Sequence, residues 1–269
     1  MDNEHRLEIA IRAAVAAGNT LIQHYDDKLH VSKKESLRDI VTEIDKIAES
    51  QVIGILQSLP DETAIISEEA GLVKMSKSER SWVIDALDGT VNYVNHIPFF
   101  AVSIALIEKG EPTIGVIYNP MSSDLYYGAE GIGVFKNQSA LRVTKKNGQD
   151  CLFSVAFSGK NYHPQGRKDE FLLMGRINDD SRGCLRTGSA SMNLAYLAEG
   201  RLGGCWGKAN KVWDIAAGLL LAKLAGARVQ KTPLDPLKGQ NNNFVNYIAA
   251  ASSAWDILHK NASAILGLE

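Results

Sequence analysis

Hydrophobic residues in the first part of the chain recur at the spacing of helices. Between residues 6 and 25 they return every three or four positions, which predicts an amphipathic helix. The recurring positions are Leu7, Ile11, Ala14, Val15, Gly18, Ile22 and Tyr25. A second helix is expected from about Thr42 to Leu59, because Pro60 follows it. The polar and basic residues 27–40 between the two helices predict a loop or an exposed hairpin.

Short hydrophobic runs bounded by turn residues predict strands in the middle of the chain. These runs span residues 63–66, 82–84, 99–107 and 113–118, and glycine-containing hairpins follow up to about residue 143. Farther on, strands at 151–158 and 181–186 alternate with helices at 167–178, from Ser189, from Trp213 to about Leu224, and near 253–265. Gly226 closes the third of these helices, a strand follows it, and residues 241–243 predict a turn.

This alternation predicts layered helices and sheets. We expect one domain spanning residues 1–269 with two lobes, of about residues 1–145 and 146–269, joined at the polar segment near residue 145.

The composition is that of a globular protein. Of the 269 residues, 45% are hydrophobic and 22% are charged, and the net charge of −2 gives no support for direct nucleic-acid binding. The three cysteines form no CxxC motif, so free thiols in a reducing compartment are expected. The N-terminus does not resemble a signal peptide, and no hydrophobic run approaches the ~20 residues of a membrane helix. We therefore expect a soluble, cytoplasmic protein.

Two carboxylates follow the hydrophobic run at residues 82–84. If residues 85–90 form a loop leaving the sheet, Asp85 and Asp88 can turn toward one point and bind a hard cation such as Mg²⁺. Backbone N–H groups around Gly89 and Thr90 could then hold a phosphate. A turn that caps a helix would explain the same residues. This segment alone leaves both interpretations open.

Other acids occupy similar positions. Glu68 and Glu69 follow the run at 63–66, where solvated surface is the common role and a ligand at a strand end is the alternative. Asp214 lies at the start of a hydrophobic helix, where acids are often found because of the helix dipole. Asp45 lies one turn into the second helix, where it is less useful as a cap. No single acid decides the function, but their order along the chain is informative.

Four segments carry a resemblance to a known family: DIVTEID at 39–45, ISEEAG at 66–71, WVIDALDGTVNYV at 82–94 and VWDIAAGLLLAKLAGA at 212–227. Together they resemble the inositol monophosphatase family of magnesium-dependent, lithium-sensitive phosphatases. RTGSASMNLAYLAEGR at 186–201 is also similar to that family, so the resemblance covers nearly the whole chain. It implies a single catalytic domain with an α+β or α/β fold, a layered α-β-α-β-α sandwich that is usually a homodimer.

The resemblance also implies a metal site with two or three Mg²⁺ ions. Glu68, Asp85 and the backbone carbonyl of Leu87 would hold one ion. Asp85, Asp88 and Asp214 would hold a second, and a third, weaker ion would share Glu68.

Further residues have implied roles in substrate binding and catalysis. Gly89 and Thr90 would bind the phosphate, and Thr90, with Asp45 behind it and Glu68 nearby, would orient the attacking water. The remaining substrate-binding positions implied by the resemblance are Asp88, Ser189, Gly207 and Lys34, the last on a loop that closes over the site.

Two positions depart from the family pattern. Ala86 replaces a proline, which we expect activity to tolerate. Gly207 replaces the glutamate that binds inositol hydroxyls, and Lys208, Asn210 and Lys211 lie close to it in sequence. We therefore expect a small phosphate ester with a second phosphate or carboxylate to be a better substrate than inositol 1-phosphate. Alternatively, a short gap in the alignment brings Glu199 or another acid into this role.

Other functions remain open at this point. Within the same fold they are a 3′-phosphoadenosine 5′-phosphate nucleotidase, a fructose 1,6-bisphosphatase and a histidinol-phosphate phosphatase. A binding factor in RNA metabolism is a non-enzymatic alternative. The presence of all four carboxylate ligands favours an enzyme.

Overall fold

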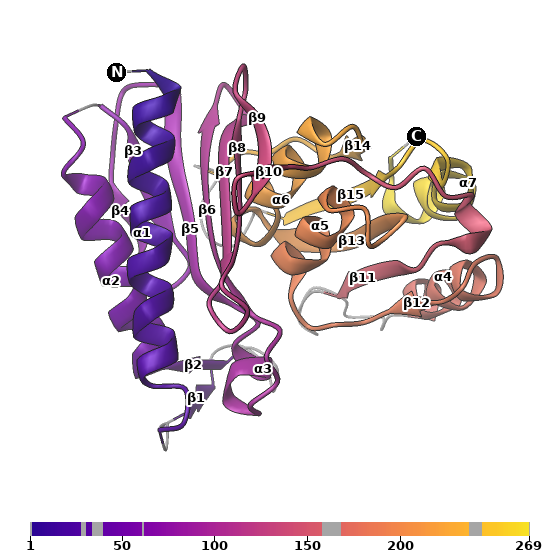
Figure 1. Cartoon of the computed structure of the whole chain (residues 1–269), viewed down its shortest axis with the longest axis horizontal. Coiled ribbons are helices and arrows are strands. Elements are labelled where there is room, and N and C mark those ends of the chain that lie inside the picture. The colour runs from indigo at the N-terminus through magenta and orange to yellow at the C-terminus, as the bar shows by residue number, and fades with distance from the viewer. Residues whose placement is uncertain are drawn as a thin grey trace.

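The computed structural model describes residues 2–27, 31–33, 40–60, 62–157, 168–236 and 244–268 (Figure 1). The predictions made for Lys34 and for the turn at 241–243 lie outside these residues. Within them, no helix has the length and hydrophobicity that a membrane crossing requires. The helices are α1 (Asn3–Gln23), α2 (Glu43–Gln57), α3 (Thr90–Val94), α4 (Lys168–Asp179), α5 (Ala190–Ala198), α6 (Val212–Leu224) and α7 (Trp255–Leu266), with a 3₁₀ turn η1 at Gly148–Asp150.

The strands form two sheets and one small hairpin. In spatial order the eight-stranded sheet comprises β10 (Ser139–Ala140), β9 (Gly133–Lys136), β8 (Asp124–Ala129), β7 (Glu111–Asn119), β6 (Ala101–Glu108), β5 (Arg80–Asp88), β3 (Ala64–Ser67) and β4 (Gly71–Lys74). The five-stranded sheet comprises β12 (Cys184–Leu185), β11 (Phe153–Phe157), β13 (Gly204–Lys211), β15 (Phe244–Ala250) and β14 (Arg228–Lys231). The hairpin pairs β1 (Val31–Lys33) with β2 (Ile40–Thr42).

Five layers stack across the molecule, and this confirms the predicted α-β-α-β-α sandwich. Helices α1 and α2 cover one face of the eight-stranded sheet, α5 and α6 lie between the two sheets, and α4 and α7 cover the far face of the five-stranded sheet (Figure 1). The first sheet ends at Ala140 and the second begins at Phe153. The division into two lobes near residue 145 stays a prediction.

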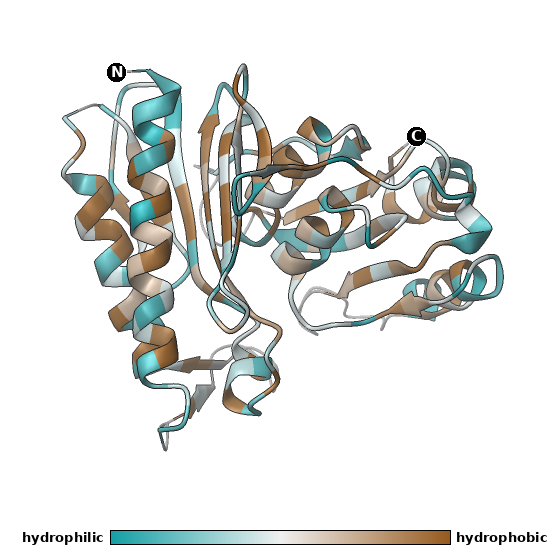
Figure 2. Ribbon diagram, in the orientation of Figure 1, coloured by the Kyte–Doolittle hydropathy of each residue, from teal (hydrophilic) through white to brown (hydrophobic). Residues whose placement is uncertain are grey.

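Strand β5 shows how burial on both faces shapes the sequence. Trp82 and Ile84 pack into the core beside α1 and α2, whereas Val83 packs into the core beside α5 and α6. A strand covered on both faces needs a continuous hydrophobic run and not an alternating one. Figure 2 shows this as hydrophobic colour along the central strands of the first sheet.

Most predicted elements are present, with differences at their edges. Helix α1 is confirmed, but Ile22, assigned to its buried stripe, is 41% exposed. Leu7, Ala14 and Gly18 are buried as expected. The buried face also includes the small residues Ala10, Ala13 and Ala17, which allow the helix to pack closely against its neighbours. Elements that the sequence did not predict are β4, β13, β15 and the short helix α3.

The loop considered for residues 85–90 is not present at residues 85–88, which belong to a strand. Strand β5 continues to Asp88, and its register against β6 shifts between Asp85 and Asp88. Because side chains alternate along a strand, Asp85 lies on the same face as Val83, the face that α6 covers. The acids are therefore held by the sheet itself.

Candidate active site

Three carboxylates from separate elements meet at one point between the first sheet and α6. Glu68 follows β3, Asp85 lies on β5, and Asp214 lies in the first turn of α6. One carboxylate oxygen from each lies within 4.8 Å of the other two. Ser103 of β6 donates a hydrogen bond to the carbonyl of Trp213 at 2.9 Å, which fixes the start of α6 against the sheet beside Asp214.

The electrostatics of this cluster fit a divalent cation. Burial raises the pKa of Asp85 well above its ordinary value, and the charges of Glu68, Asp88 and Asp214 raise it further. Burial likewise raises the pKa of Asp214, with added repulsion from Asp88 and Glu68. Clustered carboxylates repel each other strongly in a buried site, and a hard cation with oxygen ligands removes that repulsion. The donor set therefore suits Mg²⁺.

Asp88 is held by the N-terminal end of α5. Its Oδ2 accepts hydrogen bonds from the Ser189 hydroxyl at 2.6 Å, from the Ser191 backbone N–H at 2.7 Å, and from the Ser191 hydroxyl. Burial raises the pKa of Asp88, and these hydrogen bonds oppose the rise. Ser191 was not singled out from the sequence, although it lies in the segment that resembles the family. Substrate contact by Ser189, which caps α5, stays a prediction.

Asp45 both caps α2 and contacts Thr90. With Thr42 it forms a capping box, so the expectation that Asp45 is poorly placed as a cap is wrong. The Thr90 hydroxyl lies 3.2 Å from Asp45 Oδ1 and 3.1 Å from the carbonyl of Leu87. Burial raises the pKa of Asp45 to about 6, although hydrogen bonds from Thr42 act in the opposite direction. The structure thus brings together Asp45 and Thr90, which lie 45 positions apart.

The backbone after Asp85 is tightly constrained. The Leu87 N–H donates to Asp85 Oδ1 at 2.9 Å. Gly89 adopts a left-handed conformation with φ 99°, and a Cβ there would lie 3.2 Å from both Phe100 Cβ and the Phe99 carbonyl oxygen. Glycine is the residue that tolerates both restrictions. The roles assigned to Leu87 and Gly89 in metal and phosphate binding stay predictions.

A pocket of about 560 Å³ opens beside the acidic cluster. Glu68, Asp88 and Asp214 line it, and the other charged residues in its lining are Arg186 and Lys211. The charge of Lys211 partly offsets the rise in the pKa of Asp214. The remaining lining residues are Val91, Asn92, Ile97, Val155, Ala156, Phe157, Thr187, Gly188, Ser189, Ala190, Ala209 and Asn210. The lining of the pocket therefore carries both carboxylates and cations.

Gly207 lies next to Asn210 of the pocket lining, and the structure leaves no open space for a side chain at position 207. A Cβ at position 207 would lie 2.0 Å from Asn210 Oδ1 and 2.7 Å from Tyr247 Cε1. The alternative that Glu199 moves into the substrate site is wrong. Glu199 lies at the opposite end of α5 from Ser189 and accepts hydrogen bonds from Tyr126 at 2.7 Å and Lys136 at 3.0 Å.

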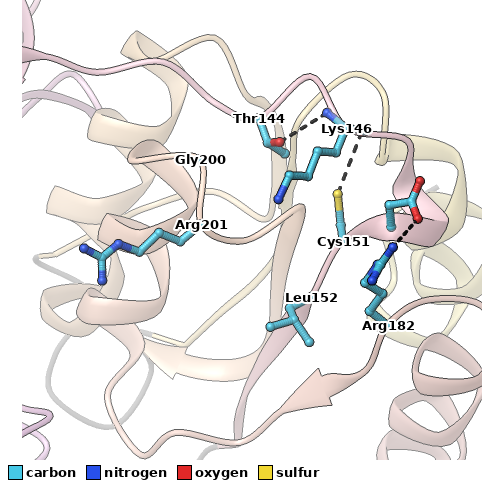
Figure 3. A pocket seen from close by; sticks show the side chains of 8 residues that line it. Thr144, Lys146, Cys151, Leu152, Arg182, Gly200 and Arg201 are labelled. Atoms are coloured by element: carbon cyan, nitrogen blue, oxygen red, sulfur yellow. Dashed lines mark hydrogen bonds and ion pairs between the residues drawn. The ribbon is translucent and has the colours of Figure 1, made fainter.

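A second hollow, of about 490 Å³, lies near the start of β11 (Figure 3). Arg182 pairs with Asp150 at 2.8 Å, and Arg201 pairs with Glu199 at 2.9 Å. The Arg201 guanidinium points away from Lys146 and Arg182 (Figure 3). Two of its three cations are thus paired with acids, which leaves little positive charge in this hollow for an anion.

Comparisons with known proteins agree with this geometry. The family model described as "Inositol monophosphatase family" matches residues 2–264. Nus factor SuhB of Pasteurella multocida is 40% identical over 227 residues, covering 83% of this chain and 84% of that protein. Inositol-1-monophosphatase of Mesorhizobium japonicum is 37% identical over 226 residues, again covering 83% and 84%.

The fold of this chain is also similar to that of a solved structure. The inositol monophosphatase of Anabaena superimposes with a TM-score of 0.80 at 31% identity, over 99% of this chain and 97% of that one. The layered fold, the acidic cluster and the match along almost the entire sequence lead to the same conclusion: this chain belongs to the inositol monophosphatase family.

Proposed function

We propose that this protein is a Mg²⁺-dependent phosphomonoesterase that hydrolyses a small phosphorylated polyol, sugar or related phosphate ester. The observation that carries the proposal is the cluster of Glu68, Asp85 and Asp214 at the end of a pocket of about 560 Å³. Asp88 and the Leu87 carbonyl complete the proposed ligand set. Bound Mg²⁺ neutralises phosphate charge and lowers the pKa of a coordinated water, which supplies a nucleophile at neutral pH.

The residues of the chain position the reactants. The Thr90 hydroxyl can donate its proton to Asp45 Oδ1, at 3.2 Å, and its oxygen is then able to accept a hydrogen bond from the attacking water. Backbone N–H groups of Gly89 and Thr90 bind the phosphate, and the wall of the pocket binds the alcohol portion. Such positioning contributes to the rate because the reacting groups are held at short range.

Phosphate release with and without Mg²⁺ tests the proposal. The panel comprises inositol 1-phosphate, fructose 1,6-bisphosphate, 3′-phosphoadenosine 5′-phosphate, histidinol phosphate and AMP, with Asp88→Asn and Asp214→Asn as variants. Asp256→Asn is the matched control, because Asp256 also follows a tryptophan in the first turn of a helix but is exposed. We expect Mg²⁺-dependent release that both active-site variants lose and the control retains. Folded protein that releases phosphate from none of these esters would contradict the proposal.

The relatives named Nus factor SuhB favour a second candidate function, that of a binding factor in RNA metabolism. Comparing the wild type with Asp214→Asn distinguishes the binding function from the phosphatase function. If binding to purified transcription complexes is the function, the wild type and Asp214→Asn bind equally well, because the substitution removes only metal binding. The homodimer expected from the resemblance stays a prediction, which size-exclusion chromatography with light scattering tests.

A further inference from the structure

The side chain of Asn92 joins the short helix α3 to the loop that precedes α5. Asn92 is 6% exposed and lines the pocket beside the acidic cluster. Its Nδ2 donates to the carbonyl of Phe99 at 2.7 Å and to the carbonyl of Thr187 at 2.9 Å. Thr187 lies 95 positions farther along the chain, so this amide connects the first half of the chain to the second.

These two hydrogen bonds require an amide. A backbone carbonyl oxygen accepts hydrogen bonds and donates none, so the nitrogen of Asn92 must face both partners, and both of its N–H protons are used. An aspartate has almost the same shape but no donor, and its carboxylate would lie against two carbonyl oxygens. Alanine would remove both hydrogen bonds. The orientation of the Asn92 side chain is therefore fixed by its partners.

The loop before α5 packs directly onto this amide. Gly188 has a left-handed φ of 96°, and a Cβ there would lie 2.8 Å from both Nδ2 and Oδ1 of Asn92. The neighbouring Thr187 is in turn tied to α5, because its hydroxyl donates to Asn193 Oδ1 at 2.7 Å. Asn92 therefore holds the N-terminal end of α5 as well as the loop.

The same end of α5 also holds Asp88, four residues before Asn92. Asp88 Oδ2 accepts hydrogen bonds from Ser189 and Ser191. The segment that contains Asp88 and Asn92 is thus joined to the N-terminal end of α5 by two connections, one at each of these residues. Losing the connection at Asn92 loosens the restraint on Asp88, because the two segments can then move relative to each other.

We propose that Asn92 is a positioning residue for the metal site: it holds the N-terminal end of α5 against α3 and so keeps Asp88 in place as a ligand of Mg²⁺. The inference rests on the proposed function, in which Asp88 is one of the metal ligands. Residues that orient a metal ligand commonly contribute about 10- to 100-fold to metal affinity.

Isothermal titration with Mg²⁺ tests this inference. Asn92→Ala should raise the Kd for Mg²⁺ about 10-fold or more. Asn95→Ala is the matched control, because the exposed Asn95 amide donates to the Val91 carbonyl at 2.7 Å at the end of the same helix. This control should leave the Kd unchanged. If Asn92→Ala lowers the urea midpoint of unfolding but leaves the Kd unchanged, Asn92 is only a structural residue and the inference is overturned.

A second variant approaches the same contact from the loop. Gly188→Ala places a methyl group against the Asn92 amide and should weaken Mg²⁺ binding in the same direction. It also tests the inference if Asn92→Ala does not fold. A folded Gly188→Ala protein with the Kd of the wild type would overturn the inference.

A double-mutant cycle tests whether Asn92 acts through Asp88. Ser191→Ala removes one of the hydrogen bonds to Asp88 and should also raise the Kd. If the two connections support each other, the double variant Asn92→Ala/Ser191→Ala should raise the Kd by less than the product of the two single effects. Effects that multiply would show that Asn92 acts independently of Asp88, and this outcome would contradict the inference.

Failure of the inference is distinguishable from failure of the proposed function. A wild type that binds Mg²⁺ and releases phosphate, together with an Asn92→Ala protein of unchanged Kd, overturns the inference alone. A wild type that neither binds Mg²⁺ nor releases phosphate overturns the proposed function and the inference with it.

Discussion

The side chain of Glu49 accepts a hydrogen bond from the backbone N–H of Glu69 at 2.8 Å, one residue beyond Glu68 of the acidic cluster. Its second oxygen accepts from the N–H of Ala70 at 3.1 Å. On the other side of the turn, the Glu68 N–H donates to the Ile84 carbonyl at 3.1 Å. The turn that presents Glu68 is therefore fixed from α2 and from β5 together.

Replacing Glu49 by glutamine should weaken Mg²⁺ binding. The substitution leaves one acceptor oxygen and turns the other into a donor that faces an N–H group, so the turn loosens. Loss of a residue that orients a metal ligand typically lowers metal affinity about 10- to 100-fold. Isothermal titration with Mg²⁺ measures the change, and Glu62→Gln, on an exposed loop, serves as the control. Unchanged Mg²⁺ affinity in a folded Glu49→Gln protein would show that β5 alone positions Glu68.

Asp214→Asn should stabilise the metal-free protein while abolishing its response to Mg²⁺. Burial and neighbouring acids raise the pKa of Asp214, so its ionised form destabilises the folded state. Removing the charge should increase the free energy of unfolding in EDTA by about 1–2 kcal/mol. Thermal melts with EDTA and with Mg²⁺ give both quantities. A variant that melts below the wild type in EDTA, or that is still stabilised by Mg²⁺, would contradict this expectation.

The metal-free protein should lose stability as the pH rises through the range in which Asp45 ionises. Burial raises the pKa of Asp45 from 3.8 to about 6, so the folded state holds this proton more tightly than the unfolded state. The resulting stabilisation is complete below about pH 4, the unfolded pKa, and it disappears as the pH rises through about 6. The shift corresponds to about 3 kcal/mol at most.

Urea denaturation in EDTA between pH 4 and pH 7.5 measures this effect. Other buried acids contribute to the slope, so the contribution of Asp45 is the difference between the wild type and Asp45→Asn. Parallel curves for the two proteins would show that folding does not raise the pKa of Asp45.

Glu199→Gln should destabilise the protein without altering substrate preference. Glu199 accepts from Tyr126 and Lys136, and Lys136 also pairs with Asp124 at 3.0 Å. These side chains are only partly exposed, so weakening the network should cost about 1–3 kcal/mol. Urea denaturation checks the first statement, and the ratio of kcat/KM for fructose 1,6-bisphosphate to that for inositol 1-phosphate checks the second. A shift of that ratio would contradict the second statement.

The sequence predicted the elements whose signals are local. Periodic hydrophobic positions located α1, a hydrophobic segment closed by Gly226 located α6, and the run at 82–84 located β5. The same reasoning ended β5 too early, because Asp85 and Asp88 are unusual residues for a buried strand. Asp85 and Asp88 can lie in β5 because residues distant in sequence surround them, namely Asp214 and the serines at the start of α5.

In the site, too, features with a local sequence signal could be predicted, and features set by distant residues could not. The four carboxylates could be identified from their motifs, and the absence of a side chain at Gly207 could be read directly. The position of Asn210 over Gly207 could not, because it depends on a left-handed Ala209 and on an anchor from Asn246 in another strand. A residue with φ above zero that is neither glycine nor in a turn motif gives little signal in the sequence.

Asp214 comes from α6, between the two sheets, whereas the other acids of the site come from the first half of the chain. The site therefore depends on both halves. A chain cut at the polar segment near residue 145 would leave Glu68, Asp85 and Asp88 on one fragment and Asp214 on the other. Neither fragment would hold all of the proposed ligands, and the Ser103–Trp213 hydrogen bond would have to form again between them. Under the proposed function, Mg²⁺-dependent phosphate release would then measure how far the two fragments reassemble.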